Sequence, residues 1–477
     1  DHRRATTFPS TYGDANTSLT IHLIGDTSSP RLWASTMYGL RAYDIIDGSL
    51  RPVSLDNILP EGMSVIDNTA FDNKGNLWVS GFSPHTFILS HPDTSIMKAD
   101  LSSVRKQLHN RPFIRNTVKE GDNIWLGQDR EPIALYLPKA GTIAFDKNVS
   151  TISRPSVTDF CKRQDGQGIW GKEQNQLYHL WYDGLAIQSR VETKARGFIN
   201  CILDAGGGEV YIGHQEGIDL YHATTHTATR IPVSAKRVVA ILKAHDGNLY
   251  YASDDSRLSC YNARQGEQVL LHQSEITDMA EDENGYIWAT TRHGDLLCHH
   301  PATGKTMIDD KGSNANGDNI KHIAIDAKGH LWLLSDQMVK EYNPRSRAYR
   351  IFRSSDKAIQ MDCFHHVKAE GDHVTIDGAG GILYIQPSAN IDQLSSGASP
   401  IVTSVTIDGI RQIVGINSKQ LDIRHDAVNI EIQFSTLNYL HADKVSYAYR
   451  LSSVDTQWHY LPQGVNKATF VLLPKGD

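Results

Sequence analysis

Short apolar runs, separated by sharp polar turns, fill residues 276–300. The first run begins at Ile276 and ends at residues 282–285, whose sequence DENG joins acidic residues to an Asn-Gly pair. A second run (286–290, YIWAT) and a third (295–300, DLLCHH) follow it. Asn-Gly between two β-rich runs is a strong hairpin signal, because Gly readily adopts a positive φ. The pattern therefore predicts three short antiparallel strands.

The same unit recurs along most of the chain, with one residue at a fixed place in its second strand. Neighbouring copies of this residue are 38 to 47 positions apart, by subtraction. The nine copies are Trp33, Trp78, Trp125, Trp170, Tyr211, Tyr250, Trp288, Trp332 and Thr375. A period of about 40 with four short strands per unit is typical of β-propeller blades, whereas helical repeats of about 33–34 residues fit neither period nor composition. The ninth copy lacks the aromatic residue but keeps the frame, since it reads EGDHVTID beside EGDNIWLG in the third.

The acidic residues of the unit have a structural explanation. In copies such as Asp246-Gly247 and residues 282–285, Asp can cap the turn through its side chain while Gly takes a positive φ. The aromatic residue is expected to pack between neighbouring blades, where it buries a large apolar area. The recurring carboxylates are therefore poor catalytic candidates, and we predict no catalytic residue.

The repeats stop near Pro400, after which apolar and polar residues alternate without the Asp-Gly-Trp unit. We therefore predict an all-β protein, in which β-propeller repeats (a seven-bladed ring plus extra blades) precede a C-terminal Ig-like β-sandwich. The expected parts are blades left from an N-terminal propeller (1–111), the ring (112–387), a Ser-rich linker (388–399) and the sandwich (400–477), which ends where another strand is expected. One ring of eight or nine blades is the alternative.

Composition limits the function further. The formal net charge of −7 gives no electrostatic reason to expect a nucleic-acid partner. No apolar run approaches the roughly 20 residues that a transmembrane helix needs, and the N-terminus has no apolar signal core. The five cysteines form no CxxC pair, which argues against a disulfide framework or a zinc site. Adjacent strand residues such as His299 and His300 point to opposite faces, so we predict neither a metal nor a cofactor.

The repeat D-x-x-G-[NYH]-[LI]-W followed by G-[LI]-x-x-Y resembles the two-component-regulator propeller repeat. The segment from Asn429 onward resembles the tyrosine-motif sandwich domain that follows such repeats. The resemblance implies the periplasmic sensor region of a Bacteroides-type hybrid two-component system, tethered to the inner membrane by a helix C-terminal to this chain. Sensors of this family carry two seven-bladed propellers, and the nine copies here match neither one ring nor two.

A ligand site is predicted on one face of the ring, where the loops after the second and fourth strands meet. Its candidate residues are hydrogen-bonding side chains suited to sugar hydroxyls and carboxylates. They are Asp129, Arg130, His214, Gln215, Asp254, Arg292 and His293. Arg130 and Arg292 rank first for a uronate or a sulfate, because guanidinium groups bind such anions in a bidentate manner.

A second candidate set occupies one place in the first strand of each unit. Seven of these eight residues are polar, which an ordinary buried strand would not tolerate, so we expect them to face a central channel. They are Asn68, Asn116, Asp159, Asn200, Ala240, Asp278, His322 and His366.

The function that the resemblance implies is a sensor that binds glycan-derived oligosaccharides and signals to a kinase absent from this chain. We expect a homodimer through the C-terminal sandwich, and no enzymatic activity in this region. Two alternatives remain open: a propeller enzyme that degrades glycans as a lyase or hydrolase, and a scaffold for protein interactions.

Overall fold

The computed structural model divides into two units, Thr94–Ser399 and Asp1–Asp93 with Pro400–Asp477. We describe each unit by itself. The structure describes residues 20–26, 30–36, 39–46, 49–53, 65–71, 76–81, 86–89, 95–104, 106–108, 113–128, 132–145, 159–272, 275–310, 319–356, 359–388, 400–412, 423–424, 426–436, 447–451, 454–455, 458–462 and 465–472. The predicted ligand-binding residues Asp129 and Arg130 lie outside these ranges.

Four-stranded antiparallel sheets follow one another along Thr94–Ser399, and we number these blades 1 to 7. Each of blades 1 to 3 is a simple meander of consecutive strands. Their strands are β9 (Ile114–Glu120), β10 (Asn123–Gln128), β11 (Ala134–Leu137), β12 (Thr142–Phe145), β13 (Asp159–Lys162), β14 (Ile169–Glu173), β15 (Gln176–Tyr182), β16 (Ile187–Lys194), β17 (Ile199–Gly206), β18 (Glu209–His214), β19 (Gly217–His222) and β20 (Thr227–Arg230).

Blades 4 to 6 repeat this meander. Their strands are β21 (Val238–Lys243), β22 (Leu249–Ser253), β23 (Arg257–Asn262), β24 (Gly266–His272), β25 (Ile276–Glu281), β26 (Ile287–Thr291), β27 (Leu296–His300), β28 (Lys305–Asp310), β29 (His322–Ile325), β30 (Leu331–Leu334), β31 (Met338–Tyr342) and β32 (Tyr349–Arg353).

Blade 7 joins the two ends of the unit. Its first three strands are β33 (Cys363–Glu370), β34 (His373–Ala379) and β35 (Gly381–Ile385), and its fourth is β8 (Ile96–Lys98), which comes from before blade 1. A 3₁₀ turn, η1 (Ser102–Val104), connects β8 to blade 1. The ring therefore begins before residue 112, because the outer strand of its last blade precedes its first blade.

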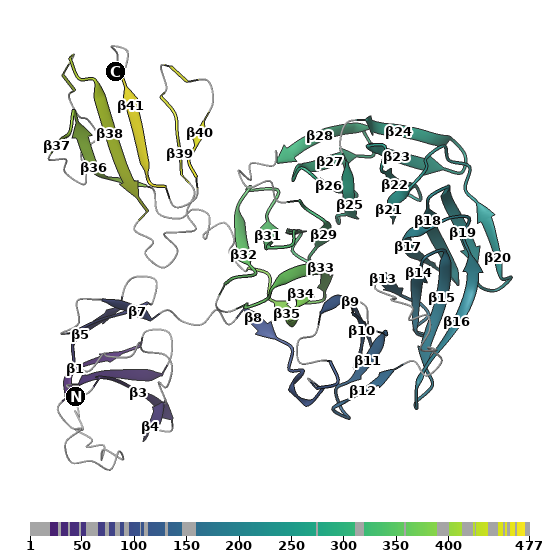
Figure 1. The fold of residues 1–477 in the computed structure, drawn as a ribbon, viewed down its shortest axis with the longest axis horizontal. Helices are drawn as coiled ribbons and strands as arrows, with labels where there is room; N and C mark the ends of the chain where they lie inside the picture. The colour runs from purple at the N-terminus through teal and green to yellow at the C-terminus, as the bar shows by residue number, and fades with distance from the viewer. Residues whose placement is uncertain are drawn as a thin grey trace, which may run out of the picture. The chain divides into compact units, whose positions relative to one another are not determined.

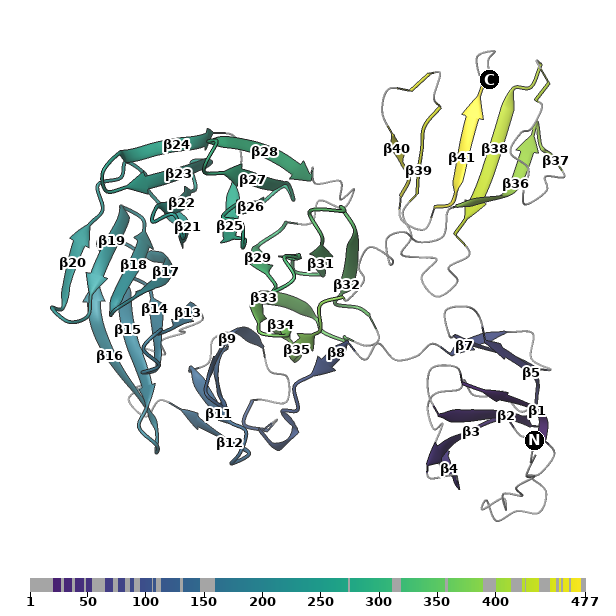
Figure 2. The same ribbon diagram turned by 180° about the vertical axis from the view of Figure 1, so that it is seen from behind.

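The first strands of the blades surround the centre of a ring (Figure 1), and the reverse view shows the same order (Figure 2). Each first strand lies against that of the next blade, and β33 lies against β9, which closes the ring. Among the described residues this ring has seven blades. Such radial repetition around a centre defines a β-propeller.

The Asp-Gly turns and the aromatic residues build the blades as the sequence pattern indicates. In blade 5 the carboxylate of Asp282 accepts the Trp288 Nε1–H at 2.9 Å and two backbone N–H groups of its own turn. Gly285 in that turn has a φ of 77°, which favours Gly. Blade 6 repeats the bond between Asp326 and Trp332, also at 2.9 Å. One acid thus fixes both the turn and the indole.

Hydrophobic clusters span neighbouring blades rather than single sheets. Trp288 of blade 5 packs with Leu331 and Leu333 of blade 6. Trp125 of blade 1 packs in the same way with Phe160 and Ile169 of blade 2. Burying a large aromatic side chain in this manner contributes roughly 1.5–3 kcal/mol. The aromatic residue of each such blade therefore stabilises the seam with the next blade.

Two sheets precede the ring and share one hydrophobic cluster, in which Trp33 and Leu40 of the first meet Ile66 and Val79 of the second. The first sheet has four strands and the second has three. Their strands are β1 (Thr20–Gly25), β2 (Arg31–Thr36), β3 (Gly39–Ile46), β4 (Ser49–Val53), β5 (Ile66–Phe71), β6 (Leu77–Gly81) and β7 (Phe87–Leu89).

The C-terminal part contains a four-stranded and a two-stranded sheet, and an Ig-like topology stays a prediction. Val405, Ile407 and Ile430 form its core. The described part of the whole chain contains no helix with the length and apolarity needed to cross a membrane. The strands are β36 (Ile401–Ile407), β37 (Ile410–Gln412), β38 (Asn429–Ser435), β39 (Ala448–Tyr449), β40 (His459–Tyr460) and β41 (Lys467–Val471).

Candidate ligand-binding sites

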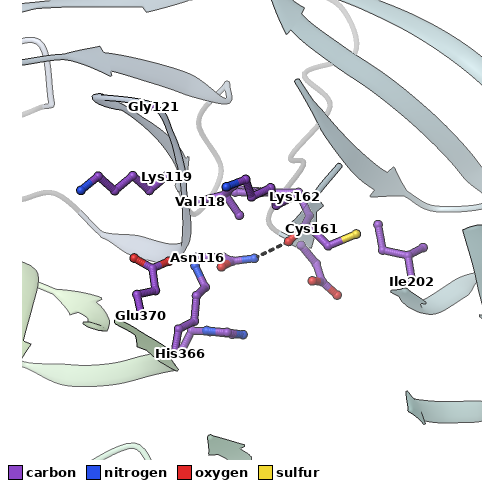
Figure 3. Close-up of a pocket in the computed structure, with 12 residues that line it drawn as sticks. Asn116, Val118, Lys119, Gly121, Cys161, Lys162, Ile202, His366 and Glu370 are labelled. Carbon is purple, nitrogen blue, oxygen red and sulfur yellow. Dashed lines mark hydrogen bonds between the residues drawn. The ribbon is translucent and has the colours of Figure 1, made fainter. Parts of the chain in front are cut away.

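A cavity of about 740 Å³ lies at the centre of the ring, where the first strands of blades 1, 2, 3 and 7 converge. Figure 3 shows lysine, carboxylate, amide and imidazole side chains around it. This volume is within the roughly 300–1,000 Å³ of known small-molecule sites. The polar residues that line it include Asn116, Lys119, Asp159, Lys162, His366 and Glu370.

Two buried polar groups of this cavity have no protein partner. Asn116 is 3% exposed, and its Nδ2 donates to the Phe160 carbonyl at 2.9 Å (Figure 3). The Oδ1 atom of Asn116 and the Nδ1 atom of His366 have no hydrogen bond to a described residue. Burial lowers the pKa of His366 well below its ordinary value, and nearby His322 and Lys368 act in the same direction. Two of the residues that line the cavity therefore each carry one buried polar atom without a described partner.

The first-strand positions predicted to face a channel have two roles in the ring. Asn116, Asp159 and His366 line the central cavity. Asn200 donates to the Val238 carbonyl of the next blade at 3.0 Å. Asp278 accepts the backbone N–H of Ile323 in the next blade at 3.2 Å. Asn116 has both roles, because it also donates to Phe160 of the next blade.

The candidates predicted on the loop face of the ring lie on the turns after the second strands of the blades. Gln215, Asp254, Arg292 and His293 are exposed there, on blades 3, 4 and 5. The backbone carbonyl of Gln215 accepts the N–H of Arg237, whose carbonyl accepts the N–H of Asp254. Gln215 and Asp254 are therefore both hydrogen-bonded to the backbone of Arg237. The arrangement places the described candidates on consecutive blades of one face.

Ion pairs at this face give several of these side chains a structural partner. Asp254 pairs with Arg237 at 2.8 Å, and Arg292 pairs with Glu275 at 3.0 Å. In both pairs the partner directly precedes the first strand of the same blade. Exposed pairs of this kind contribute about 0–1 kcal/mol each, so a ligand could displace them at little cost.

His214 is removed from the candidates by its burial. The ring is 0% exposed, and its Nε2 lies 3.1 Å from Asp219 Oδ2 and 3.1 Å from Arg230 Nη1. Its Nδ1 accepts the backbone N–H of Glu216 at 3.2 Å. Both nitrogens are therefore used within blade 3. The residue stabilises the blade rather than contacting a ligand.

One cluster has the residue types of a metal site, namely Asp326, His330 and Glu341. Its oxygens already accept hydrogen bonds, however. Glu341 accepts His330 Nδ1 at 3.0 Å and the Ser388 N–H at 2.7 Å, while Arg350 Nε donates to its other oxygen at 2.9 Å. Since these donors satisfy the carboxylate, the cluster is an ion-pair network and not a preferred site for a cation.

A second cavity, of about 450 Å³, lies between blade 7 and blade 1. Sequence reasoning did not select the residues that line it. They include Thr117, Lys119, Glu370, His373, Thr375 and Tyr384. The sequence feature that could have indicated this cavity is the missing aromatic residue at position 375 in the ninth repeat.

Comparison with known proteins agrees with the propeller architecture. No family model matches the sequence. The chain is 20% identical over 438 residues to histidine kinase P4 of Formosa agariphila, a match that covers 88% of this chain and 26% of that protein. The chain thus spans about a quarter of the length of this curated relative.

Solved structures show the same fold. The extracellular domain of the proposed hybrid two component system BT3049 from B. thetaiotaomicron matches with a TM-score of 0.60 and 15% identity, covering 96% of this chain and 64% of that one. The extracellular domain of BT4673 from the same bacterium gives 0.54 and 15%, covering 96% and 66%. A catalytically inactive virginiamycin B lyase from Staphylococcus aureus gives 0.50 and 11%, covering 61% and 98%. The extracellular domains of hybrid two component systems, which the repeat pattern resembles, are thus among the structures that share this fold.

Proposed function

We propose that this chain is the extracytoplasmic ligand-sensing region of a two-component regulator and that it binds glycan-derived oligosaccharides. The sensor role is supported by the match to the BT3049 extracellular domain, which extends over 96% of this chain. The proposal places the region in the periplasm, tethered to the inner membrane. Its output would pass to a kinase through a homodimer formed by the C-terminal sandwich.

The central cavity is the observation that carries the ligand proposal. Its lining combines ammonium donors with carboxylate acceptors, as the hydroxyls of a sugar require. A hydrogen bond from a ligand to a charged group of this kind contributes about 1.5–3 kcal/mol. A hydroxyl-rich ligand therefore fits better than an apolar one.

Signalling requires that the ligand bind two states of the sensor with different affinities. A coupling of about 1–3 kcal/mol is typical of such linkage. Sedimentation of the purified chain with and without ligand measures one form of this coupling. A ligand-dependent shift from monomer to dimer is the expected result.

Calorimetry against a panel of neutral, uronate-containing and sulfated oligosaccharides tests the proposal directly. The same mixtures are then examined for reaction products. Saturable binding without product is expected. Product formation would instead support a glycan-degrading enzyme, and the absence of binding to every oligosaccharide would support a protein scaffold.

A further inference from the structure

The seam between blade 7 and blade 1 differs from the other seams of the ring at one position. In blades 1 to 6 an aromatic residue of the second strand faces the next blade. These residues are Trp125, Trp170, Tyr211, Tyr250, Trp288 and Trp332. Blade 7 has Thr375 instead, which pairs with Lys368 of β33 as Trp125 pairs with Val118 of β9. The closing seam therefore lacks one aromatic side chain.

The acid that would hold the missing indole is still present. In blade 1 the Trp125 Nε1–H donates to Glu120 at 2.8 Å. The sequences EGDNIW and EGDHVT place Glu370 where blade 1 has Glu120. Within the described part of the chain, the Glu370 carboxylate has no hydrogen bond and no salt bridge. Blade 7 thus retains the acceptor and has lost its donor.

A pocket occupies the place of the absent side chain. The cavity of about 450 Å³ lies between Thr117, Lys119 and Ile124 of blade 1 and residues of blade 7. Thr375 lines this pocket and is 4% exposed, and its buried Oγ1 has no hydrogen bond to a described residue. A hydroxyl buried in this way is costly unless something pairs with it. The pocket therefore holds an unsatisfied hydroxyl beside an unpaired carboxylate.

The charges around the pocket define the ligand that it would accept. On its rim, Asp122 pairs with Lys139, and Asp372 pairs with His373 at 3.0 Å. Like Glu370, the ammonium of Lys119 forms no ion pair with a described residue, so the groups without an ion pair are one cation and one anion. Their charges cancel, which favours a neutral ligand over a uronate or a sulfate.

An aromatic wall completes the pocket. The ring of Tyr384 meets His373 edge to face, with centroids 5.2 Å apart. Aromatic rings in this position can pack against the apolar C–H face of a sugar ring. Around the wall, Glu370 accepts hydrogen bonds, Lys119 donates them, and Thr375 can do either.

We propose that this seam pocket binds one neutral pyranose unit of an oligosaccharide. The sugar hydroxyls would pair with Glu370, Lys119 and Thr375, and the sugar ring would pack on Tyr384. The inference rests on the proposed oligosaccharide sensing and adds where one sugar unit sits and what charge it carries. Two consecutive blades supply the contacts, so binding would also strengthen the closure of the ring.

Thr375→Trp tests the proposal, because it restores the side chain found at this place in four other blades. The probes are uncharged di- to tetrasaccharides of glucose, galactose, mannose and xylose, titrated into the full chain by calorimetry. The affinity for the best neutral probe should fall at least about tenfold, with the circular dichroism spectrum unchanged. Unchanged affinity in a folded Thr375→Trp protein would overturn the proposal.

Glu370→Gln is a second variant that does not depend on packing a large residue. It should weaken binding roughly tenfold, since a hydrogen bond to a charged group is replaced by a weaker one. Glu283→Gln is its matched control, because Glu283 is an exposed turn acid of blade 5 that pairs with Arg345 at 3.3 Å. The control should bind as the native chain does. Equal affinity in Glu370→Gln and Glu283→Gln would contradict the proposal.

Different results would overturn the sensing function and the seam pocket. If the native chain binds none of the oligosaccharides, neutral or anionic, the sensing function and the seam pocket are both overturned. If it binds one and both pocket variants bind it equally well, the seam pocket is overturned; Thr375→Trp is the variant that separates this pocket from the central cavity, because Glu370 lines both. If anionic probes bind the pocket more tightly than their neutral counterparts, the inferred charge is wrong.

Discussion

Two seams of the same ring show different ways of joining blades. Between blades 6 and 7, Trp332 is fully buried and packs in a cluster with Phe364 and Ile376 of blade 7. Its ring stacks on Phe352 with centroids 5.9 Å apart. Between blades 7 and 1, Thr375 occupies the equivalent place and leaves a cavity. The first seam is sealed by apolar area at this place, whereas the second has an apolar cluster around Ile382 and Leu126 but a cavity beside Thr375.

Directional polar bonds add to this apolar cluster at the closing seam. The carboxylate of Asp377 accepts the backbone N–H of Thr117 at 2.8 Å and its hydroxyl at 2.9 Å. Lys368 Nζ lies 3.8 Å from the same carboxylate. These contacts fix the register of the two ends of the ring without filling the seam. A propeller can therefore stay closed while keeping a pocket between two blades.

Trp332→Thr should have the largest effect, because it gives the sealed seam the side chain of the closing seam. Replacing a buried aromatic residue by a small one costs about 3–5 kcal/mol through lost burial and a residual cavity. Urea unfolding followed by near-ultraviolet circular dichroism measures this loss. Trp332→Phe keeps most of the packing and serves as the control. A loss of unfolding free energy below about 1 kcal/mol for Trp332→Thr would show that buried apolar area does not stabilise this seam.

Asp377→Asn should have the next largest effect. The side-chain amide can accept only through one atom, so part of the bonding to Thr117 is lost, and Lys368 loses its countercharge. Leaving such buried groups poorly paired costs about 1–3 kcal/mol. Urea unfolding should show this cost for Asp377→Asn and almost none for Asp372→Asn, whose carboxylate is exposed. Equal effects of the two variants on the free energy of unfolding would show that the polar bonds of Asp377 do not stabilise the closed ring.

Glu341→Gln probes the polar contacts on the other side of blade 7. Arg350 binds Glu341 and also donates to Ser95 and to the Gln386 carbonyl. Burial favours the neutral form of Glu341, but the hydrogen bond from His330 and the charge of Arg350 outweigh it and lower its pKa.

The pH dependence follows from the sign of this shift. A carboxyl whose pKa is lowered by folding stabilises the fold above its unfolded-state pKa, and the contribution is lost as pH falls through the folded-state pKa. Between about pH 5 and pH 3, the native chain should lose about 1–2 kcal/mol more stability than Glu341→Gln. Urea midpoints at each pH measure the difference. A difference in stability between the native chain and Glu341→Gln that does not change with pH would contradict the lowered pKa of Glu341.

The repeat pattern was sufficient to predict the blades, because each Asp-Gly turn and each aromatic residue acts within its own unit or on the next one. It could not predict β8, which is three residues long, has no turn signal and pairs with β35 at the far end of the ring. Strand pairing over such a separation depends on ring closure, which no local pattern encodes.

The candidate site was harder to predict for a related reason. His214 was selected as a loop residue, yet it is buried because Asp219 and Arg230 come from the two following strands to meet it. Thr375 was visible as a lost aromatic residue, but a missing side chain predicts a pocket only if the neighbouring blade does not fill it. Ile124 and Thr117 of blade 1 leave that space open.

Thr375→Trp should have the smallest effect on stability and the opposite sign. Filling a cavity with a residue that the other seams already use should add about 0.5–2 kcal/mol in urea unfolding. If the indole also donates to Glu370, the closing seam becomes like the sealed one.

The same variant separates stability from binding. A bound ligand at about 100 times its dissociation constant should stabilise the native chain by about 2.7 kcal/mol. Thr375→Trp should gain little from the same ligand because its pocket is filled. Thermal scans should therefore cross: the variant melts higher without ligand, and the native chain melts higher with it. Equal ligand-induced shifts of the melting temperature in the two proteins would mean that the open pocket lowers the stability of the closing seam but does not bind the ligand.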